Sequence, residues 1–308
     1  MRRIKKCTVF LLVLCLLLNL AGCAAAQKPL RVTLVLKTVT EVAEFWGTLL
    51  SGVEKAAEEY GVELTVRTSP TETAIDEQIE LIRQTAAEKP DVMILSAADY
   101  DRCAEATEEA IAAGIGVVAI DTDVNAAGRA CFVGSNSYEI GLEMGRAMAS
   151  YLPEGGKVAV IQHMLTTTTG IERTRGVLDA LNEAGNIEIL GSFCCDNSTE
   201  QAQTITTELL SADPEIRGFV CTNEVCNVGA ANALVELGMG GKVFVVGCDN
   251  SQRQIALLEQ NIIQAIVIQR PFNMGYMAVQ QAVRVANGEQ TDDFVEVSRV
   301  LITRENMY

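Results

Sequence analysis

The sequence predicts an α/β protein made of two similar lobes, each a doubly wound parallel sheet with helices on both faces. Stretches rich in Val, Ile and Leu alternate with stretches of helical periodicity along the chain, a pattern typical of βαβ units. The length of 308 residues suits two domains of roughly 130–150 residues each better than one minimal core. The alternation breaks after Asp121 and then starts again, which indicates that a second lobe follows the first.

The N-terminus has the parts of an export signal. Four basic residues occur among the first six, the apolar run Val9–Leu18 follows, and Leu20–Cys23 reads Leu-Ala-Gly-Cys. The run is too short to span a bilayer permanently, and small residues follow it, as in secretory signals. The tetrad resembles the bacterial lipobox, which is cut before a cysteine that then carries acyl chains. We therefore expect residues 1–22 to be a lipoprotein signal peptide and Cys23 to be lipidated. The alternative is an ordinary signal peptide that is cut a few residues later.

The first lobe is predicted from a series of alternating elements. Branched apolar residues mark each strand, apolar residues spaced three and four apart mark each helix, and Gly61, Pro90 and Gly114 mark helix ends. In chain order the predicted elements are the strand Arg31–Lys37, the helix Val42–Tyr60, the strand Val62–Arg67, the helix Ala74–Lys89, the strand Asp91–Leu95, the helix Arg102–Ala113, the strand Ile115–Ile120 and the short strand Cys131–Val133.

The same signals predict a second series. Its elements are the helix Tyr138–Leu152, the strand Val158–Ile161, the helix Ile171–Ala184, the strand Ile187–Ser192, the helix Glu200–Leu210, the strand Gly218–Cys221, the helix Asn227–Leu237, the strand Val243–Val246, the helix Gln252–Gln260, the strand Ile263–Ile268, the helix Met274–Asn287 and a last strand Phe294–Ile302. No segment after the signal is apolar enough to suggest a membrane span.

The two series contain the same pattern of residues and elements. A proline and an acidic residue, a strand, a helix that ends at glycine and a strand that ends in aspartate span Pro90–Asp121 and again Pro214–Asp249. Ligands of open parallel sheets bind at the carboxyl ends of the strands. Two facing lobes would therefore direct Asp121 and Asp249 into one cleft.

The composition excludes several classes of function. Asp and Glu number 40 against 24 Lys and Arg, a net charge of −16, and such a surface repels nucleic acids. The sequence has no phosphate-binding glycine loop, metalloprotease motif or nucleophile elbow. The only histidine is His163, which is interpreted as structural, and the run Thr166–Thr169 is interpreted as a loop. We expect no metal, no cofactor, no nucleic acid partner and no enzymatic activity.

Six short stretches occur in the order found in a known family. They resemble the sugar-binding proteins of ABC importers, which are ribose-binding-protein-like and have the type I periplasmic binding protein fold. The resemblance extends over essentially the whole chain after the signal. The stretches are Phe45-Trp46, Val118–Asp121, Glu172–Gly176, Cys221–Glu224, Val245–Asp249 and Ala265–Pro271. It implies a three-segment hinge, with 29–133 plus 270–298 in the N-terminal lobe and 134–269 plus 299–308 in the C-terminal lobe.

The resemblance also implies a ligand-binding set. Aspartates accept hydrogen bonds from sugar hydroxyls, a guanidinium donates them, amides do both, and aromatic rings stack on the C–H faces. The residues carried over from the family are Phe45, Trp46, Asp121, Arg173, Asn223, Asp249 and Gln269. Simpler alternatives are helix capping for the two aspartates, an exposed helix charge for the arginine, and core packing for the tryptophan. An exposed charge is the preferred interpretation of Arg175.

The chain departs from the family pattern at four other positions. Ala43 stands where the family has asparagine, and Thr122 stands where ribose binders have an arginine. Asn197 or a neighbour stands where the second lobe has an aromatic residue, and Glu224 replaces the usual aspartate. Ribose itself is therefore not the expected ligand.

The resemblance implies an extracytoplasmic lipoprotein that binds a monosaccharide or similar polyol in the cleft and delivers it to an ABC permease. Such a protein would be a monomer, held by its lipid anchor at the outer face of the cytoplasmic membrane. The alternative is a sensor that docks on a membrane histidine kinase or chemoreceptor, and both functions would depend on lobe closure. Two carboxylates facing a sugar would also suit a glycosidase, but nothing in the sequence marks one of them as a proton donor.

Overall fold

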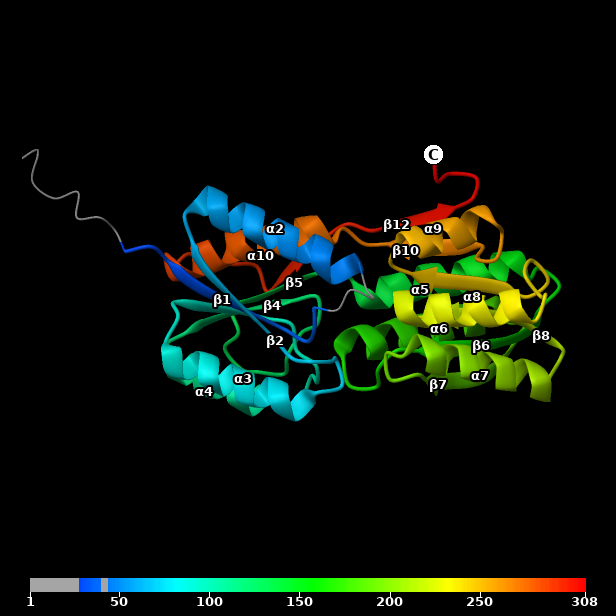
Figure 1. The fold of residues 1–308 in the computed structure, drawn as a ribbon, viewed down its shortest axis with the longest axis horizontal. Helices are drawn as coiled ribbons and strands as arrows, with labels where there is room; N and C mark the ends of the chain where they lie inside the picture. The colour runs from blue at the N-terminus through cyan, green and yellow to red at the C-terminus, as the bar shows by residue number, and fades with distance from the viewer. Residues whose placement is uncertain (1–27, 40–43) are drawn as a thin grey trace, which may run out of the picture.

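A computed structural model describes residues 28–39 and 44–308 of the chain. The predicted signal peptide, Cys23 and Ala43 lie outside the described residues. Figure 1 shows two lobes side by side along the long axis of the molecule, each with a sheet between layers of helices. The predicted two-lobed α/β architecture is confirmed.

The first lobe has a six-stranded sheet in the order β11-β5-β4-β3-β1-β2. In Figure 1, α2 and α10 lie above this sheet, and α3 and α4 lie below it. The elements are β1 (Arg31–Leu36), α2 (Glu44–Tyr60), β2 (Glu63–Thr68), α3 (Ile75–Glu88), β3 (Val92–Leu95), α4 (Ala104–Ala112), β4 (Gly116–Ile120), β5 (Cys131–Gly134), α10 (Pro271–Ala286) and β11 (Phe294–Glu296).

The second lobe repeats this arrangement in the order β12-β10-β9-β8-β6-β7. Its strands are parallel except β12, which pairs antiparallel with β10. The elements are α5 (Ser137–Tyr151), β6 (Gly156–Gln162), α6 (Thr168–Ala184), β7 (Ile187–Cys194), α7 (Thr199–Ala212), β8 (Ile216–Cys221), α8 (Glu224–Glu236), β9 (Phe244–Cys248), α9 (Gln252–Glu259), β10 (Ala265–Ile268) and β12 (Val300–Thr303).

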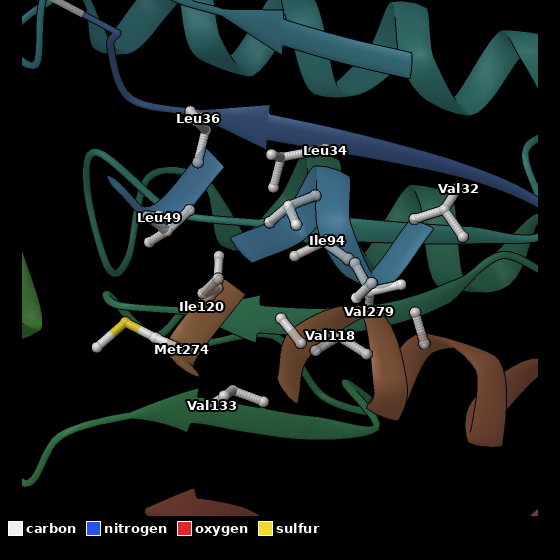
Figure 2. Close-up of a cluster of buried hydrophobic side chains, with 14 of the residues drawn as sticks. Val32, Leu34, Leu36, Leu49, Ile94, Val118, Ile120, Val133, Met274 and Val279 are labelled. Carbon is white, nitrogen blue, oxygen red and sulfur yellow. The ribbon is translucent and has the colours of Figure 1, made fainter. Parts of the chain in front are cut away.

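The strand β1 shows why both faces of the sheet need helices. Leu34 and Leu36 point toward α2 and α10 and pack near Leu49 and Val279 (Figure 2). Val35, which lies between the two leucines, belongs to a separate buried cluster under α3 and α4. Successive strand residues point to opposite faces, so an unbroken apolar run such as this one is buried on both sides.

The helices α6 and α8 each begin three residues before the predicted start. The Thr167 side chain accepts a hydrogen bond from the Gly170 amide at 3.2 Å, and the Asn223 side chain accepts one from the Cys226 amide at 3.0 Å. Threonine and asparagine are favoured caps at helix N-termini. Apolar periodicity alone missed these first turns, because a side-chain cap rather than the apolar repeat determines where each helix begins.

The chain passes between the two sheets three times. It leaves the first sheet after β5, returns to the first lobe between β10 and α10, and leaves it again between β11 and β12. The prediction of one strand over Phe294–Ile302 is wrong, because the segment 297–299 connects two strands that lie in different sheets. The lobe boundaries at 133/134, 269/270 and 298/299 stay a prediction. None of the helices in the described part of the chain is long and apolar enough to cross a membrane.

Candidate ligand-binding site

A pocket lies between the two lobes, where the carboxyl ends of both sets of strands meet. It encloses about 400 Å³ of space between atoms, its open mouth included. The seven residues predicted to bind ligand all line it. The full lining is Lys37, Phe45, Trp46, Glu72, Asp121, His163, Thr169, Arg173, Asn197, Asn223, Glu224, Val225, Asp249 and Gln269.

On the first-lobe side, a buried lysine holds two carboxylates. The Lys37 Nζ lies 3.3 Å from Glu72 Oε2 and 3.5 Å from Asp121 Oδ2, and the lysine is only 2% exposed. Lys37 directly follows β1, and Asp121 directly follows β4. Burial raises the pKa of Asp121, and the positive charges of Lys37 and Arg173 act against this shift. A buried lysine and carboxylates of this kind suit hydrogen bonding to a polar ligand that has lost its water.

The two aromatic residues of α2 form the wall next to these charges. The rings of Phe45 and Trp46 meet edge to face with centroids 5.1 Å apart. The Trp46 Nε1 donates a hydrogen bond to Glu72 Oε1 at 3.1 Å, and Lys37 Nζ lies 5.3 Å from the centre of the indole ring. Trp46 therefore takes part in the polar network as well as in the apolar core, and Phe45 adds a second apolar surface to the pocket.

On the second-lobe side, the position of α6 and a hydrogen bond to a backbone carbonyl hold the Arg173 side chain in place. Its Nη1 donates to the Thr222 carbonyl at 2.8 Å and lies 3.7 Å from Asp249 Oδ2. The position of α6 depends on Gly141 and Gly176, where α5 and α6 touch. A Cβ on Gly141 would lie 2.2 Å from the Arg173 carbonyl oxygen, which no side chain tolerates. Arg173 is only 2% exposed, and its Nε has no hydrogen-bond partner among the described residues.

Asp249 is oriented by Gln269 and does not cap a helix. The Gln269 Nε2 donates to Asp249 Oδ1 at 2.6 Å, which joins the ends of β9 and β10. The cap of α9 is Ser251, whose side chain accepts from the Gln254 amide. The alternative that Asp249 is an N-cap is therefore wrong, and its carboxylate faces the pocket.

Asn223 has two roles. Its side-chain oxygen caps α8, and its Nδ2 donates to Asn197 Oδ1 at 2.8 Å. Asn197 stands near the position of the family's second-lobe aromatic, so an amide contact replaces a ring there. A functional side chain that also caps its helix has a fixed orientation, which reduces the entropy lost when a ligand binds.

His163 lies at the pocket but is held by neighbouring hydroxyls. Its Nδ1 is 2.7 Å from Thr222 Oγ1, and its Nε2 is 3.2 Å from Thr169 Oγ1. Burial lowers the pKa of His163 well below the ordinary value, and the positive charges of Arg173 and Lys37 lower it further. The ring is therefore neutral at physiological pH, and these contacts support the structural interpretation of the histidine.

Several pocket residues were not among the predicted site residues. Lys37 and Glu72 follow β1 and β2, so the rule that ligands meet the carboxyl ends of strands would have found them. They were missed because neither belongs to a stretch that resembles the family. Glu224 and Asn197 were noted only as departures from the family pattern. Arg175, in contrast, is exposed, as predicted, and it pairs with Glu172.

The lobes also contact each other directly beside the pocket. The Tyr100 amide donates to the Thr166 carbonyl at 2.9 Å, and the Thr166 hydroxyl donates to the Ala98 carbonyl at 3.0 Å. The Asp123 amide donates to Thr168 Oγ1, also at 3.0 Å. We call these three bonds the threonine contact. They join the loops that follow β3 and β4 to the start of α6.

The sequence is similar to those of known binding proteins. The periplasmic binding protein domain family matches residues 33–290. The D-allose-binding periplasmic protein of Escherichia coli is 25% identical, with 94% of this chain and 96% of that protein covered. The D-ribose/D-allose-binding protein of Pseudomonas aeruginosa is 26% identical over 90% of this chain and 89% of its own length.

The fold is also similar to those of solved structures of sugar-binding proteins. A periplasmic solute-binding protein of an ABC transporter from Actinobacillus succinogenes, with bound D-allose, has a TM-score of 0.83 and 27% identity, covering 90% of this chain and 98% of that one. A glucose-galactose binding protein from Geobacillus stearothermophilus has a TM-score of 0.87 and 26% identity, covering 91% and 99%.

Proposed function

Because this chain belongs to the periplasmic binding protein domain family, which matches most of its length, we propose that it binds a monosaccharide or similar polyol between its lobes and delivers it to an ABC transporter. The family is one of binding proteins, and the chain is not an enzyme. The relatives named above carry D-ribose or D-allose in their names. We propose the transport role and the sugar ligand from similarity to these relatives.

One observation carries the proposal. Asp121, Arg173, Asn223, Asp249 and Gln269 line one pocket together with two aromatic rings, although they come from five separate strand ends and helix starts. Carboxylates and amides around a pocket with aromatic surfaces match the hydroxyl edge and the C–H faces of a sugar. We assign ligand contact to these five residues and to Phe45 or Trp46.

We further propose that the protein is exported and held at the outer face of the cytoplasmic membrane by acyl chains on Cys23. The support is the Leu-Ala-Gly-Cys tetrad at the end of the apolar run. Two or more acyl chains give stable anchoring. A monomer in this position would present its cleft to solvent and to a permease in the same membrane.

A thermal-shift screen tests the binding function. The chain from residue 29 onward is mixed in turn with hexoses, pentoses, sugar alcohols and cyclitols. A ligand that binds the folded state raises the melting temperature by mass action, and calorimetric titration of each hit gives its affinity. The proposal is wrong if no sugar or polyol shifts the melting temperature while a different class of small molecule does.

A further inference from the structure

The pocket contains more acidic groups than basic ones. Four carboxyl side chains line it, against two cations, and each of these six residues is at most 7% exposed. His163 adds no charge, because its pKa is well below the ordinary value. The six residues are Glu72, Asp121, Glu224, Asp249, Lys37 and Arg173.

Ion pairs account for three of the four carboxylates. Glu72 and Asp121 share Lys37, and Asp249 pairs with Arg173. Glu224 forms no ion pair with any described residue, and its Oε2 is buried without a hydrogen-bond partner among them. A buried carboxylate oxygen without a partner is unfavourable, because it has lost its water and gained no hydrogen bond in return.

The surroundings of Glu224 increase this cost. The pKa of Glu224 is raised to about 7. Burial is the main cause and the nearby negative charges of Asp249 and Glu44 add to it, while the Ser251 hydroxyl and the Glu44 backbone act against the shift. The group is the first residue of α8, so its helix offers it some favourable field. Two events would remove the imbalance: the uptake of a proton, or the arrival of a positive charge in the pocket.

We propose that the ligand carries a single ammonium group, as an amino sugar or amino polyol does, and that this group binds at Glu224 on the side of Asp249. This inference rests on the proposed function and names the class of sugar. An ammonium has three donors and no acceptor, which suits the free oxygen of Glu224 and the excess of acceptors around it. The hydroxyls of the same ligand are left for Asp121, Arg173 and Gln269. Among the described residues, no group of three or more His, Cys, Asp or Glu side chains is placed to hold a metal ion.

Matched pairs of ligands test the proposal. Calorimetric titrations at neutral pH compare D-glucosamine with D-glucose, D-galactosamine with D-galactose, and D-mannosamine with D-mannose, together with hexoses that carry the amine at other carbons. We expect at least one amine to bind about 10- to 100-fold more tightly than its neutral parent, the range of a charged hydrogen bond in a buried site. The N-acetylated form of that amine should lose this advantage, because it has no charge.

Two variants separate the role of Glu224 from a general effect of charge. Glu224→Gln should reduce the ratio of amine affinity to neutral-parent affinity about tenfold or more. Glu172→Gln makes the same chemical change on α6, outside the pocket lining, and should leave the preference unchanged. Circular dichroism and a melting curve confirm that each variant is folded.

Each outcome decides the inference. An amine preference that Glu224→Gln removes supports it. Neutral sugars that bind as tightly as every amine, or more tightly, overturn it and leave the proposed function intact. An amine preference that survives Glu224→Gln also overturns it, because the charge is then recognised elsewhere. If no sugar or polyol binds, with or without an amine, the proposed function fails and this inference fails with it.

Discussion

Asp121 and Asp249 occupy equivalent positions in the two lobes and share an unusual backbone conformation. Each directly follows the strand at the same place in its sheet, β4 in one and β9 in the other. Their φ angles are +62° and +66°, in the left-handed region where asparagine and aspartate are the most tolerated residues after glycine. The turn directs both carboxylates into the cleft. The pattern that is repeated in the sequence thus corresponds to two strands that end in the same way at equivalent places.

This conformation decides how the aspartates should be tested. Asp249→Asn keeps a residue that accepts a left-handed turn and removes the charged acceptor. We expect it to weaken ligand binding by roughly 10- to 200-fold, since a lost acceptor in a dry site costs about 1–3 kcal/mol. Calorimetric titration with a ligand found in the screen measures the change.

Asp196→Asn is the matched control. Asp196 also has a positive φ, +46°, but it is not in the lining of the candidate ligand-binding pocket. Its variant should bind ligand like the parent protein. Unchanged affinity in both Asp121→Asn and Asp249→Asn would remove these aspartates from the proposed site.

Lys37 predicts a large effect on stability. Lys37→Met leaves Glu72 and Asp121 buried together without a cation, and breaking a buried pair in this way costs about 3–5 kcal/mol. Urea unfolding of the ligand-free protein measures the loss. Lys55→Met, on the same lobe, removes a lysine that pairs with exposed glutamates and should leave the transition where it was. A similar midpoint for both variants would contradict the role assigned to Lys37.

The sequence predicted which residues line the pocket better than it predicted the ion pairs among the other residues there. The position of Asp121 at a strand end indicated a place in the cleft, and the resemblance to the family supplied Gln269. Lys37 and Glu72 obey the same positional rule, but a lysine after a strand is usually solvated. Their pairing depends on two loops that meet only in the folded lobe, and no local pattern encodes that meeting.

The ends of elements were harder to predict than their order. Thr167 and Asn223 cap their helices three residues before the predicted starts. The segment after Phe294 has strand character throughout, yet it divides between two sheets. Side-chain caps determine the two helix starts, and pairing with two different sheets divides the last segment, so local periodicity indicates neither boundary.

Glu224 predicts a specific dependence of stability on pH. Its folded-state pKa, about 7, lies above its ordinary value of 4.5, so the folded state holds the proton more tightly than the unfolded state does. The stabilising contribution of the protonated group is complete below about pH 4.5 and is lost as the pH rises to about 7, by up to about 3 kcal/mol.

The comparison of parent protein and Glu224→Gln isolates this contribution. The difference in their free energies of unfolding should grow in favour of the variant between those pH values and become constant above them. Chemical denaturation of both proteins across this range measures it. A difference that does not vary with pH would mean that Glu224 is as well solvated in the folded protein as in the unfolded one.

The proposed lipid anchor predicts where the protein is found in the cell. Cys23→Ala removes the acylated thiol, so the variant should stay uncut or should leave the membrane fraction. Fractionation with labelling by a fatty-acid analogue measures both outcomes. Cys103→Ala serves as the control, because Cys103 is fully buried in the first lobe. If Cys23→Ala is processed normally and still sediments with membranes, the protein is not anchored through this residue.

The threonine contact predicts a link between lobe closure and affinity. Thr168→Val keeps the size of the side chain but removes the oxygen that accepts from the Asp123 amide. The bond exists only while the lobes touch, so its loss favours the open arrangement. The apparent affinity falls with the fraction of closed molecules, by roughly 2- to 10-fold for one hydrogen bond of about 0.5–1.5 kcal/mol.

Thr204→Val is the control for this prediction. It removes a hydroxyl that bonds only within α7 and should not change the affinity. Small-angle scattering of the ligand-free proteins should show a larger radius of gyration for Thr168→Val alone. Equal radii together with equal affinities would mean that this contact does not hold the lobes closed.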